Sequence, residues 1–232
     1  MSKHTLRIYA AGGCATNLAK PFVGLESSDI YADIDPVFVD TSMSNIEGPI
    51  TEEMCYILPD VDGSGKVRRE NHQRISDSIK DIVSIHPPGD FNIVMFSAAG
   101  GSGSVAGPLI ARHLLEIEAP LICIVVGSTD SAITCTNTLN TLKSLDSISQ
   151  AAELPITLFY EENGAGVKRS EIDKRVKGAI GSISALVSGN NRELDTKDIS
   201  TWVYYNRASK VEPQLSQLSI LRDNTAVEGL NE

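Results

Sequence analysis

The stretch that decides the fold runs from Phe96 to Pro108 and reads FSAAGGSGSVAGP. It joins an apolar, β-branched run to a segment with the spacing of a helix. Glycine lets a backbone turn with positive φ and approach a ligand closely. The start of a helix adds free N–H groups and partial positive charge. The stretch therefore predicts a phosphate-binding loop, whose candidate contacts are Ala99, Gly100, Gly101, Ser102, Gly103 and Ser104.

Other motifs compete with this interpretation and fit less well. The run Gly63-Ser64-Gly65-Lys66 resembles the end of a P-loop, but valine follows it where magnesium needs Ser or Thr. A glycine pair at positions 12 and 13 suggests a dinucleotide fold, yet the residues after it do not complete G-x-G-x-x-G. Ser102 could be a hydrolase nucleophile, but its surroundings are not G-x-S-x-G and no histidine is an obvious base.

Short apolar runs alternate with helical patterns along the chain. Because the runs are nearly continuous and rich in β-branched residues, we expect strands that are buried on both faces. The alternation predicts an α/β fold, with a Rossmann-like parallel sheet covered by helices on both sides in three layers. The six expected strands are Leu6–Ala10, Val37–Val39, Cys55–Leu58, Asn92–Phe96, Leu121–Val126 and Ile156–Tyr160.

Two helices are expected after the sixth strand. The first is long, from about Ser170 to Ser188, with apolar residues at steps of three and four. The second runs roughly from Thr196 to Tyr205, and the sequence from Ala208 onward is polar and irregular.

Composition excludes several classes of protein. A net charge of −10 argues against a general nucleic-acid binder, which needs a basic face, although local glycines and N–H groups can still bind one small anion. No apolar run is long enough to predict a membrane span, and the start of the chain does not resemble a signal peptide. The four cysteines are scattered without a CxxC pair, which predicts reduced thiols rather than a zinc site.

The glycine loop also carries a family resemblance. Gly100-Gly101-Ser102-Gly103-Ser104 resembles the signature loop of the tubulin/FtsZ superfamily, commonly G-G-G-[ST]-G-[ST]-G. Its continuation through Pro108-Leu109-Ile110-Ala111 is similar to the PhuZ-like branch from large bacteriophages. The likeness covers about Thr5 to Trp202 and implies GTP or GDP as ligand, with Mg²⁺.

Further site residues follow from the order of the family's loops. The resemblance implies nucleotide contacts from Gly12, Gly13, Cys14 and Asn17 in a first loop, Asp40 in a second and Gly63, Ser64 and Gly65 in a third that senses the γ-phosphate. It also implies contacts from Gly127, Asp130 and Asn137 near the ribose, and from Asn163 and Asp173 at guanine.

The chemistry of two of these residues suits guanine. An aspartate carboxylate can accept from both N1–H and N2–H₂ of guanine, and adenine offers no such pair of donors. Asp173 would therefore select guanine, and Asn163 can donate to O6 or accept from the ring edge. Two plainer interpretations stay open: Asp173 as an ordinary acid near a helix start, and Asn163 as a turn residue.

The acids Asp195 and Asp198 lie in a segment, Leu194–Asp198, that is similar to the family's synergy loop. About 15 helical residues, or roughly 23 Å, separate Asp173 from Ser188. If Asp173 touches the base, both acids can reach only a nucleotide held by a neighbour stacked head-to-tail. The resemblance therefore implies hydrolysis in trans, with these acids as catalytic residues. Asp195 could also simply cap the next helix.

Taken with the resemblance, these patterns predict a GTP-binding domain over 1–165, a central helix with the synergy loop and a following helix over 166–207, and a C-terminal remnant or tail over 208–232. The second domain of the family is expected to be largely absent. The expected function is that of a self-assembling GTPase filament that positions phage DNA or the replication compartment in the cytoplasm of the host bacterium. It would contact neither nucleic acid nor membrane directly. The alternative is a guanine-nucleotide-binding regulatory or interaction module that does not polymerise.

Overall fold

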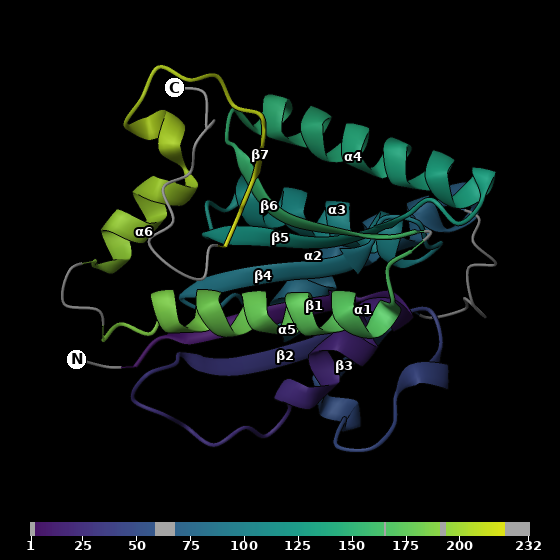
Figure 1. Cartoon of the computed structure of the whole chain (residues 1–232), viewed down its shortest axis with the longest axis horizontal. Coiled ribbons are helices and arrows are strands. Elements are labelled where there is room, and N and C mark those ends of the chain that lie inside the picture. Colours follow the sequence, from purple (N-terminus) through teal and green to yellow (C-terminus); the bar gives the residue numbers. More distant parts are fainter. Residues whose placement is uncertain (1–2, 59–67, 165, 191–193, 221–232) are drawn as a thin grey trace.

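The computed structural model describes residues 3–58, 68–164, 166–190 and 194–220 (Figure 1). Within them a seven-stranded sheet has the order β3-β2-β1-β4-β5-β6-β7, and every neighbouring pair is parallel. This arrangement confirms the predicted parallel α/β sheet. The strands are β1 Thr5–Ala11, β2 Asp33–Asp40, β3 Cys55–Ile57, β4 Phe91–Ser97, β5 Leu121–Ser128, β6 Ile156–Asn163 and β7 Leu215–Gln217.

Helices cover both faces of the sheet, giving three layers. Helices α1 and α5 pack on one face, and α2, α3 and α4 pack together on the other (Figure 1). The described residues contain the helices α1 Gly12–Ala19, α2 Arg68–Ile85, α3 Gly103–Glu116, α4 Ala132–Ala152, α5 Arg169–Leu186 and α6 Thr196–Val203. Short 3-10 turns are η1 Lys20–Phe22, η2 Met43–Asn45, η3 Glu52–Met54 and η4 Tyr205–Arg207.

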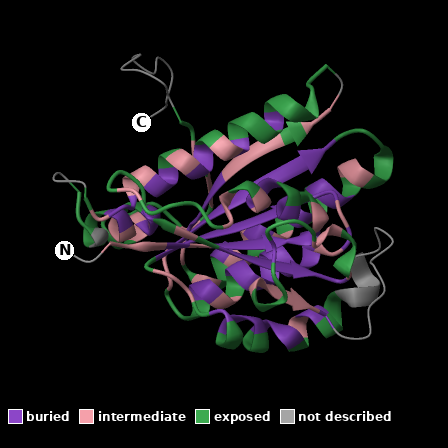
Figure 2. Ribbon diagram, turned by 90° about the horizontal axis from the view of Figure 1, so that it is seen from below, coloured by how far each residue is buried: buried purple, intermediate pink, exposed green. Residues whose placement is uncertain are grey.

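The core lies in the central strands. Every residue of β5 is buried, as is β4 from Phe91 to Phe96, and Figure 2 shows this buried layer through the middle of the molecule. Both strands are covered by helices on two faces, so neither shows alternation of apolar and polar residues. This burial explains the continuous apolar runs of the sequence.

The last strand departs from the sequence-based expectation. Leu215–Gln217 lies within the segment expected to be a remnant or tail, yet it adds a parallel edge strand beside β6. The backbone N–H of Leu218 donates to the carbonyl of Leu158 at 2.7 Å. Three residues are too few to show a strand period, and polar neighbours surround them.

Helix α5 connects the two edges of the sheet. Its first turn follows the carboxyl end of β6, and its last turn lies beside the starts of β1 and β2. There the ring nitrogen Nδ1 of His4 is 3.1 Å from the carbonyl oxygen of Val187, and the N–H of Ala32 donates to the carbonyl of Ser184 at 3.0 Å. None of the helices in the described ranges is long and apolar enough to cross a membrane.

Candidate nucleotide-binding site

The site begins where the β1–α1 turn and the glycine loop touch. Gly12 has a φ of +81°, and a Cβ at that position would lie 3.0 Å from the backbone nitrogen of Gly103. A Cβ at Gly103 would in turn lie 2.6 Å from the carbonyl oxygen of Ala11. Glycine is therefore required at both positions because two backbones pass each other without room for a side chain.

The glycine loop is held by its carbonyls. The hydroxyl of Ser104 donates to the carbonyl of Gly100 at 2.6 Å, and the amide of Asn137 donates to the carbonyl of Ala99 at 3.3 Å. The hydroxyl of Thr141 donates to the carbonyl of Ala98 at 3.0 Å. Because protein donors hold these carbonyls, the loop can turn N–H groups toward an anion, as phosphate-binding loops do.

Among the glycines at 100, 101 and 103, Gly103 serves close approach, and none of the three has a positive φ. In the described part of the chain the glycines with positive φ are Gly12, Gly24, Gly48, Gly166 and Gly189, none of them in the loop. The expected positive φ therefore occurs in the neighbouring β1–α1 turn. A Cβ at Gly100 would meet nothing nearer than Ser97, at 3.9 Å, so packing within the chain does not demand glycine there.

Asp40 joins this loop to the end of β2. The residue is buried, and its Oδ1 accepts from the N–H of Thr41 at 2.7 Å and from the hydroxyl of Ser102 at 3.3 Å. Its Oδ2 accepts from the amide of Asn45 at 3.4 Å. A Cβ at Gly13 would lie 2.5 Å from that amide nitrogen, so the Asn45 side chain covers the first loop.

Two predicted donors are thus already engaged. Ser102 donates to Asp40, and Ser104, which is fully buried, donates back into its own loop. In this structure both hydroxyls brace the loop, and their direct contact with phosphate stays a prediction. Sequence reasoning missed Asn45 because a lone asparagine shortly after a strand has the signature of any turn.

Side-chain hydrogen bonds also hold the end of β5 and the start of α4 in place. The N–H of Ser128 donates to the hydroxyl of Thr138 at 3.1 Å, and the hydroxyl of Ser128 donates to Asp130 at 3.0 Å. Ser131 and Thr134 form a capping box that starts α4. Asp130 is exposed beside the carboxyl edge. Asn137 instead points at the glycine loop, and a Cβ at Gly127 would overlap the hydroxyl of Tyr160.

Asn163, the last residue of β6, has an orphaned polar atom. Its Oδ1 is buried and has no hydrogen-bond partner in the described chain. An unpaired buried acceptor costs about 1–3 kcal/mol. The N–H groups of a guanine edge are donors of the kind that would satisfy it, so the residue fits the predicted ligand.

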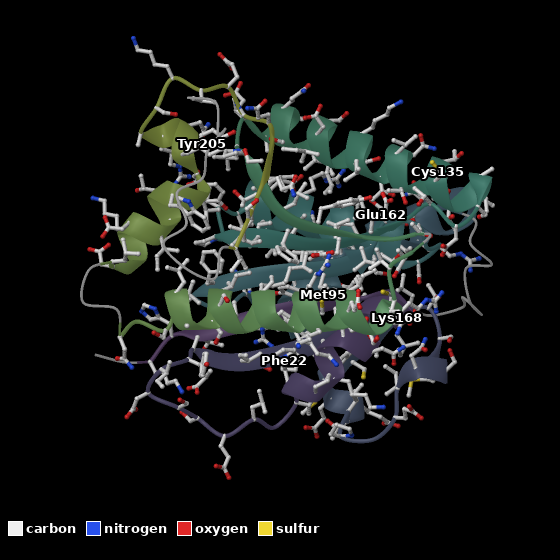
Figure 3. All side chains as sticks on the ribbon, viewed as in Figure 1. Phe22, Met95, Cys135, Glu162, Lys168 and Tyr205 are labelled. Atoms are coloured by element: carbon white, nitrogen blue, oxygen red, sulfur yellow. The ribbon has the colours of Figure 1, made fainter. Side chains whose placement is uncertain are left out.

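Helix α5 brings Asp173 toward the first loop. Cys14 is exposed as a residue, but neighbouring atoms desolvate its thiol and raise its pKa; the nearby carboxylate of Asp173 raises the pKa further, while Arg169 opposes. Asp173 and Cys14 are exposed, as is Asn17 one turn further along α1. Figure 3 shows Lys168, which precedes α5, on the same side of the molecule as Cys135 and Glu162. The predicted base-reading and phosphate-binding residues thus share one edge. The predicted contacts of the third loop, Gly63, Ser64 and Gly65, lie outside the described residues.

Asp195 and Asp198 lie elsewhere. Oδ1 of Asp195 accepts from the N–H of Asp198 at 2.9 Å, and Oδ2 of Asp198 accepts from the N–H of Asp195 at 3.1 Å, which caps α6. The hydroxyl of Tyr204 donates to the carbonyl of Ala119, just before β5, at 2.7 Å. Helix α6 therefore sits at the amino edge, at the far end of α5 from the glycine loop (Figure 1). The capping role is observed, and the catalytic role stays a prediction.

No family model matches the sequence. The chain is 31% identical over 221 residues to a phage tubulin-like protein of Pseudomonas phage PhiPA3, covering 95% of this chain and 68% of that protein. This chain belongs to the phage tubulin-like proteins. A second phage tubulin-like protein, from Pseudomonas phage phiKZ, is 28% identical over 99% of this chain and 72% of its own length. The predicted family is thereby confirmed.

Two solved phage tubulins match this tubulin-like fold. A protofilament of TubZ from bacteriophage PhiKZ aligns with a TM-score of 0.87 and 29% identity, over 94% of this chain and 68% of that one. The phage tubulin PhuZ with GDP aligns with a TM-score of 0.88 and 28% identity, over 98% and 70%.

Proposed function

We propose that this phage tubulin-like chain binds GTP and GDP at the carboxyl edge of its sheet and hydrolyses GTP when copies stack head-to-tail. The observation that carries the proposal is the interlocked glycine loop, which approaches the first loop so closely that Gly12 and Gly103 admit no side chain. The two solved relatives support it, since one is described as a protofilament and the other as bound to GDP.

The phosphates fit the glycine loop, whose carbonyls are held by protein and whose open flank lies at Gly100. Bound Mg²⁺ would neutralise phosphate charge, and it takes most of its ligands from phosphates and water. The described chain contains no group of three or more His, Cys, Asp or Glu side chains arranged for a metal. Asp40, next to Ser102, supplies an oxygen ligand of the kind that Mg²⁺ prefers.

The base fits between the end of β6 and the start of α5. Asn163 there has an unsatisfied amide oxygen, and Asp173 offers a carboxylate that can accept two N–H groups from guanine. The cost of leaving Asn163 unpaired favours a ligand that carries donors at this edge.

Hydrolysis needs a second chain in this proposal. Asp195 and Asp198 are exposed at the amino edge, beyond the end of α5, and therefore far from the glycine loop of the same chain. Stacking the amino edge of one copy on the carboxyl edge of the next brings acids and γ-phosphate together. Asp198 then orients or deprotonates the attacking water, and Asp195 fixes the first turn that carries it.

In the cell, such a filament would position phage DNA or the replication compartment in the host cytoplasm, without direct contact with nucleic acid or membrane. The competing candidate is a nucleotide-binding module that does not polymerise. The two functions differ in concentration dependence, because only the filament needs a neighbour to hydrolyse GTP.

The phosphate site is tested with Gly100→Ala. The added methyl has room in the protein, so the midpoint of thermal unfolding should not fall, whereas affinity for GTP should drop at least about tenfold because the methyl occupies phosphate space. Gly178→Ala is the matched control, since a Cβ there also meets no neighbour but lies on the exposed outer side of α5. Equal GTP affinity in all three proteins would remove the phosphate assignment.

Assembly is tested with light scattering and with GTP turnover measured at increasing protein concentration. Turnover per chain should rise with concentration if the site forms between two chains. A constant rate down to dilute monomer would contradict hydrolysis in trans. Binding without turnover or scattering at any concentration would favour the non-polymerising module.

A further inference from the structure

Three side chains form a brace between the ends of β5 and β6. Oε1 of Glu162 accepts from the hydroxyl of Thr129 at 3.2 Å, and its Oε2 accepts from the hydroxyl of Tyr160 at 3.0 Å. One carboxylate thus connects Thr129, the residue after β5, to Tyr160 within β6. A carboxylate that accepts two hydroxyls makes charge-assisted bonds, which are stronger than neutral ones.

The backbone segments that follow β5 and β6 are also in contact next to this brace. The N–H of Thr129 donates to the carbonyl of Asn163 at 3.0 Å, and a Cβ at Gly164 would lie 2.8 Å from the Thr129 hydroxyl. The ring of Tyr160 reaches under Gly127, where any side chain would overlap its hydroxyl. Burial and the hydrogen bond to Glu162 both raise the pKa of Tyr160, which therefore stays a donor at neutral pH.

Glu162 faces away from the base. Along β6 its side chain lies on the opposite face from Glu161, which pairs with Arg175 of α5 at 3.2 Å. Glu162 therefore points to the α4 side, where Figure 3 shows it with Cys135, and Asn163 points to the α5 side. A direct contact between Glu162 and a base held at α5 is not available, so any role of Glu162 passes through Thr129 and Tyr160, which donate to it.

The order of the strands indicates which part of a bound nucleotide would contact Thr129 and its neighbours. In the proposed function the phosphates lie at the end of β4 and the base at the end of β6, with β5 between them. Neighbouring strands are about 4.8 Å apart, so phosphate and base are about 10 Å apart and the sugar must cross the end of β5. The residues there are Ser128–Ser131, including the exposed carboxylate of Asp130.

We propose that Glu162 is a positioning residue that holds the Ser128–Ser131 loop in place to bind the ribose hydroxyls of the nucleotide. The inference rests on the proposed function, since it needs a nucleotide at this edge. Within it, Asp130 accepts from the sugar while Glu162 fixes the backbone that presents Asp130.

The test compares GTP with 2′-deoxy-GTP and 3′-deoxy-GTP, using the full chain and equilibrium binding. The parent should prefer GTP over at least one deoxy analogue. Glu162→Ala should weaken GTP about three- to tenfold, the range of one or two net hydrogen bonds, and leave the affinity for that analogue unchanged. Thr129→Val should have the same effect, and adding it to Glu162→Ala should cost nothing more, because both remove one brace. Glu162→Gln should recover part of the loss.

Glu116→Ala is the matched control. Glu116 is an exposed carboxylate that also pairs with neighbouring side chains, but it lies at the last turn of α3. The Glu116→Ala substitution should change neither the affinity for GTP nor the affinity for the deoxy analogue. A parent that binds no GTP contradicts the proposed function itself. A parent that binds GTP without ribose preference, or a Glu162→Ala chain that weakens GTP and the analogue equally, overturns only the role of Glu162.

Discussion

The two edges of the sheet are built differently. At the carboxyl edge four segments interlock: Asp40 ties the end of β2 to Ser102, Gly12 and Gly103 bring two backbones into contact, and Asn137 holds the glycine loop from α4. At the amino edge the two acids of α6 are exposed, and the bonds that they make among the described residues are to the first turn of their own helix.

In the proposed function, this difference distinguishes a nucleotide site that one chain builds from a catalytic site that needs a second chain. Groups held by several neighbours are preorganised for a ligand, which lowers the entropy cost of binding. In the part of the chain that the structure describes, the exposed acids cap their helix and lie at the far end of α5 from the glycine loop (Figure 1). The carboxyl edge should therefore bind nucleotide in a single chain, and the amino edge should matter only where another chain meets it.

Removing the acid at the amino edge should give the largest effect. Asp198→Asn keeps an oxygen that can accept from the N–H of Asp195, so α6 should stay capped. GTP turnover should fall by about 10²–10⁴, the usual contribution of a positioned general base, with unchanged GTP affinity. Turnover is measured by phosphate release above the assembly concentration. Lost affinity in this variant would place Asp198 in its own chain's pocket and erase the contrast between the edges.

Mixing two variants, each altered at a different edge of the sheet, tests the same difference between the edges. Asp198→Asn supplies an intact carboxyl edge, and Gly100→Ala supplies an intact amino edge. Their mixture should recover part of the turnover that neither has alone, because one chain holds the nucleotide and the other supplies the acid. No recovery at any ratio would contradict a site shared between chains.

Gly103→Ala should damage the carboxyl edge itself. Its Cβ would lie 2.6 Å from the carbonyl oxygen of Ala11, where only backbone movement can relieve the overlap. We expect a loss of about 1–3 kcal/mol in the free energy of unfolding, as for other overpacked sites. Urea unfolding measures this loss, and Gly178→Ala, with open space around its Cβ, is the control. A Gly103→Ala chain as stable as the parent would mean that the two loops do not touch.

Asp173→Ala should have a smaller and more selective effect. Loss of a charge-assisted contact to guanine should cost about 2 kcal/mol, or roughly 30-fold in GTP affinity. ATP, which lacks the paired donors, should lose little. Competition binding with both nucleotides checks the difference, and Lys174→Ala, the exposed residue next to Asp173 on α5, serves as control. Equal losses for GTP and ATP would mean that Asp173 does not read the base.

The sequence was informative where one local pattern carries the structure. Continuous apolar runs predicted β4 and β5, because strands buried on two faces need apolar residues throughout. The glycine cluster predicted the loop after β4, and the length of α5 predicted that Asp198 lies far from Asp173. These are properties of single segments, so no tertiary information was needed.

The sequence was uninformative where contacts join distant segments. Asn45 over Gly13, Thr141 on Ala98, and Glu162 between Thr129 and Tyr160 are pairings that no periodicity encodes. The same is true of β7, whose three residues become a strand only because β6 offers an open edge. The predicted donor roles of Ser102 and Ser104 illustrate the limit, since a hydroxyl in a loop can serve either a ligand or the loop.

The smallest expected effect comes from His86, near the amino edge between α2 and β4. Its side chain is buried, Nε2 has no partner in the described chain, and its carbonyl accepts from the hydroxyl of Tyr9 at 2.7 Å. Burial lowers the pKa of His86 below its ordinary 6.5, and the Arg7 guanidinium lowers it further; the carbonyl of Cys55 and the carboxylate of Asp35 oppose.

Because the lowered pKa makes His86 harder to protonate in the folded state, the unfolded state binds more protons in mildly acidic solution. The stability that this residue contributes is therefore complete above pH 6.5 and is lost as the pH falls through 6.5 toward the lower pKa of the folded state. The slope from one proton is at most about 1.4 kcal/mol per pH unit. Urea unfolding of the parent and of His86→Gln at pH 7.5 and 5.5 should show a smaller decrease in the variant, since carboxylates titrate alike in both. GTP affinity, which the proposed function assigns to the opposite edge, should respond to pH equally in the two proteins. Identical unfolding slopes would show that His86 is not held neutral, and a difference confined to GTP affinity would show that the two edges are coupled.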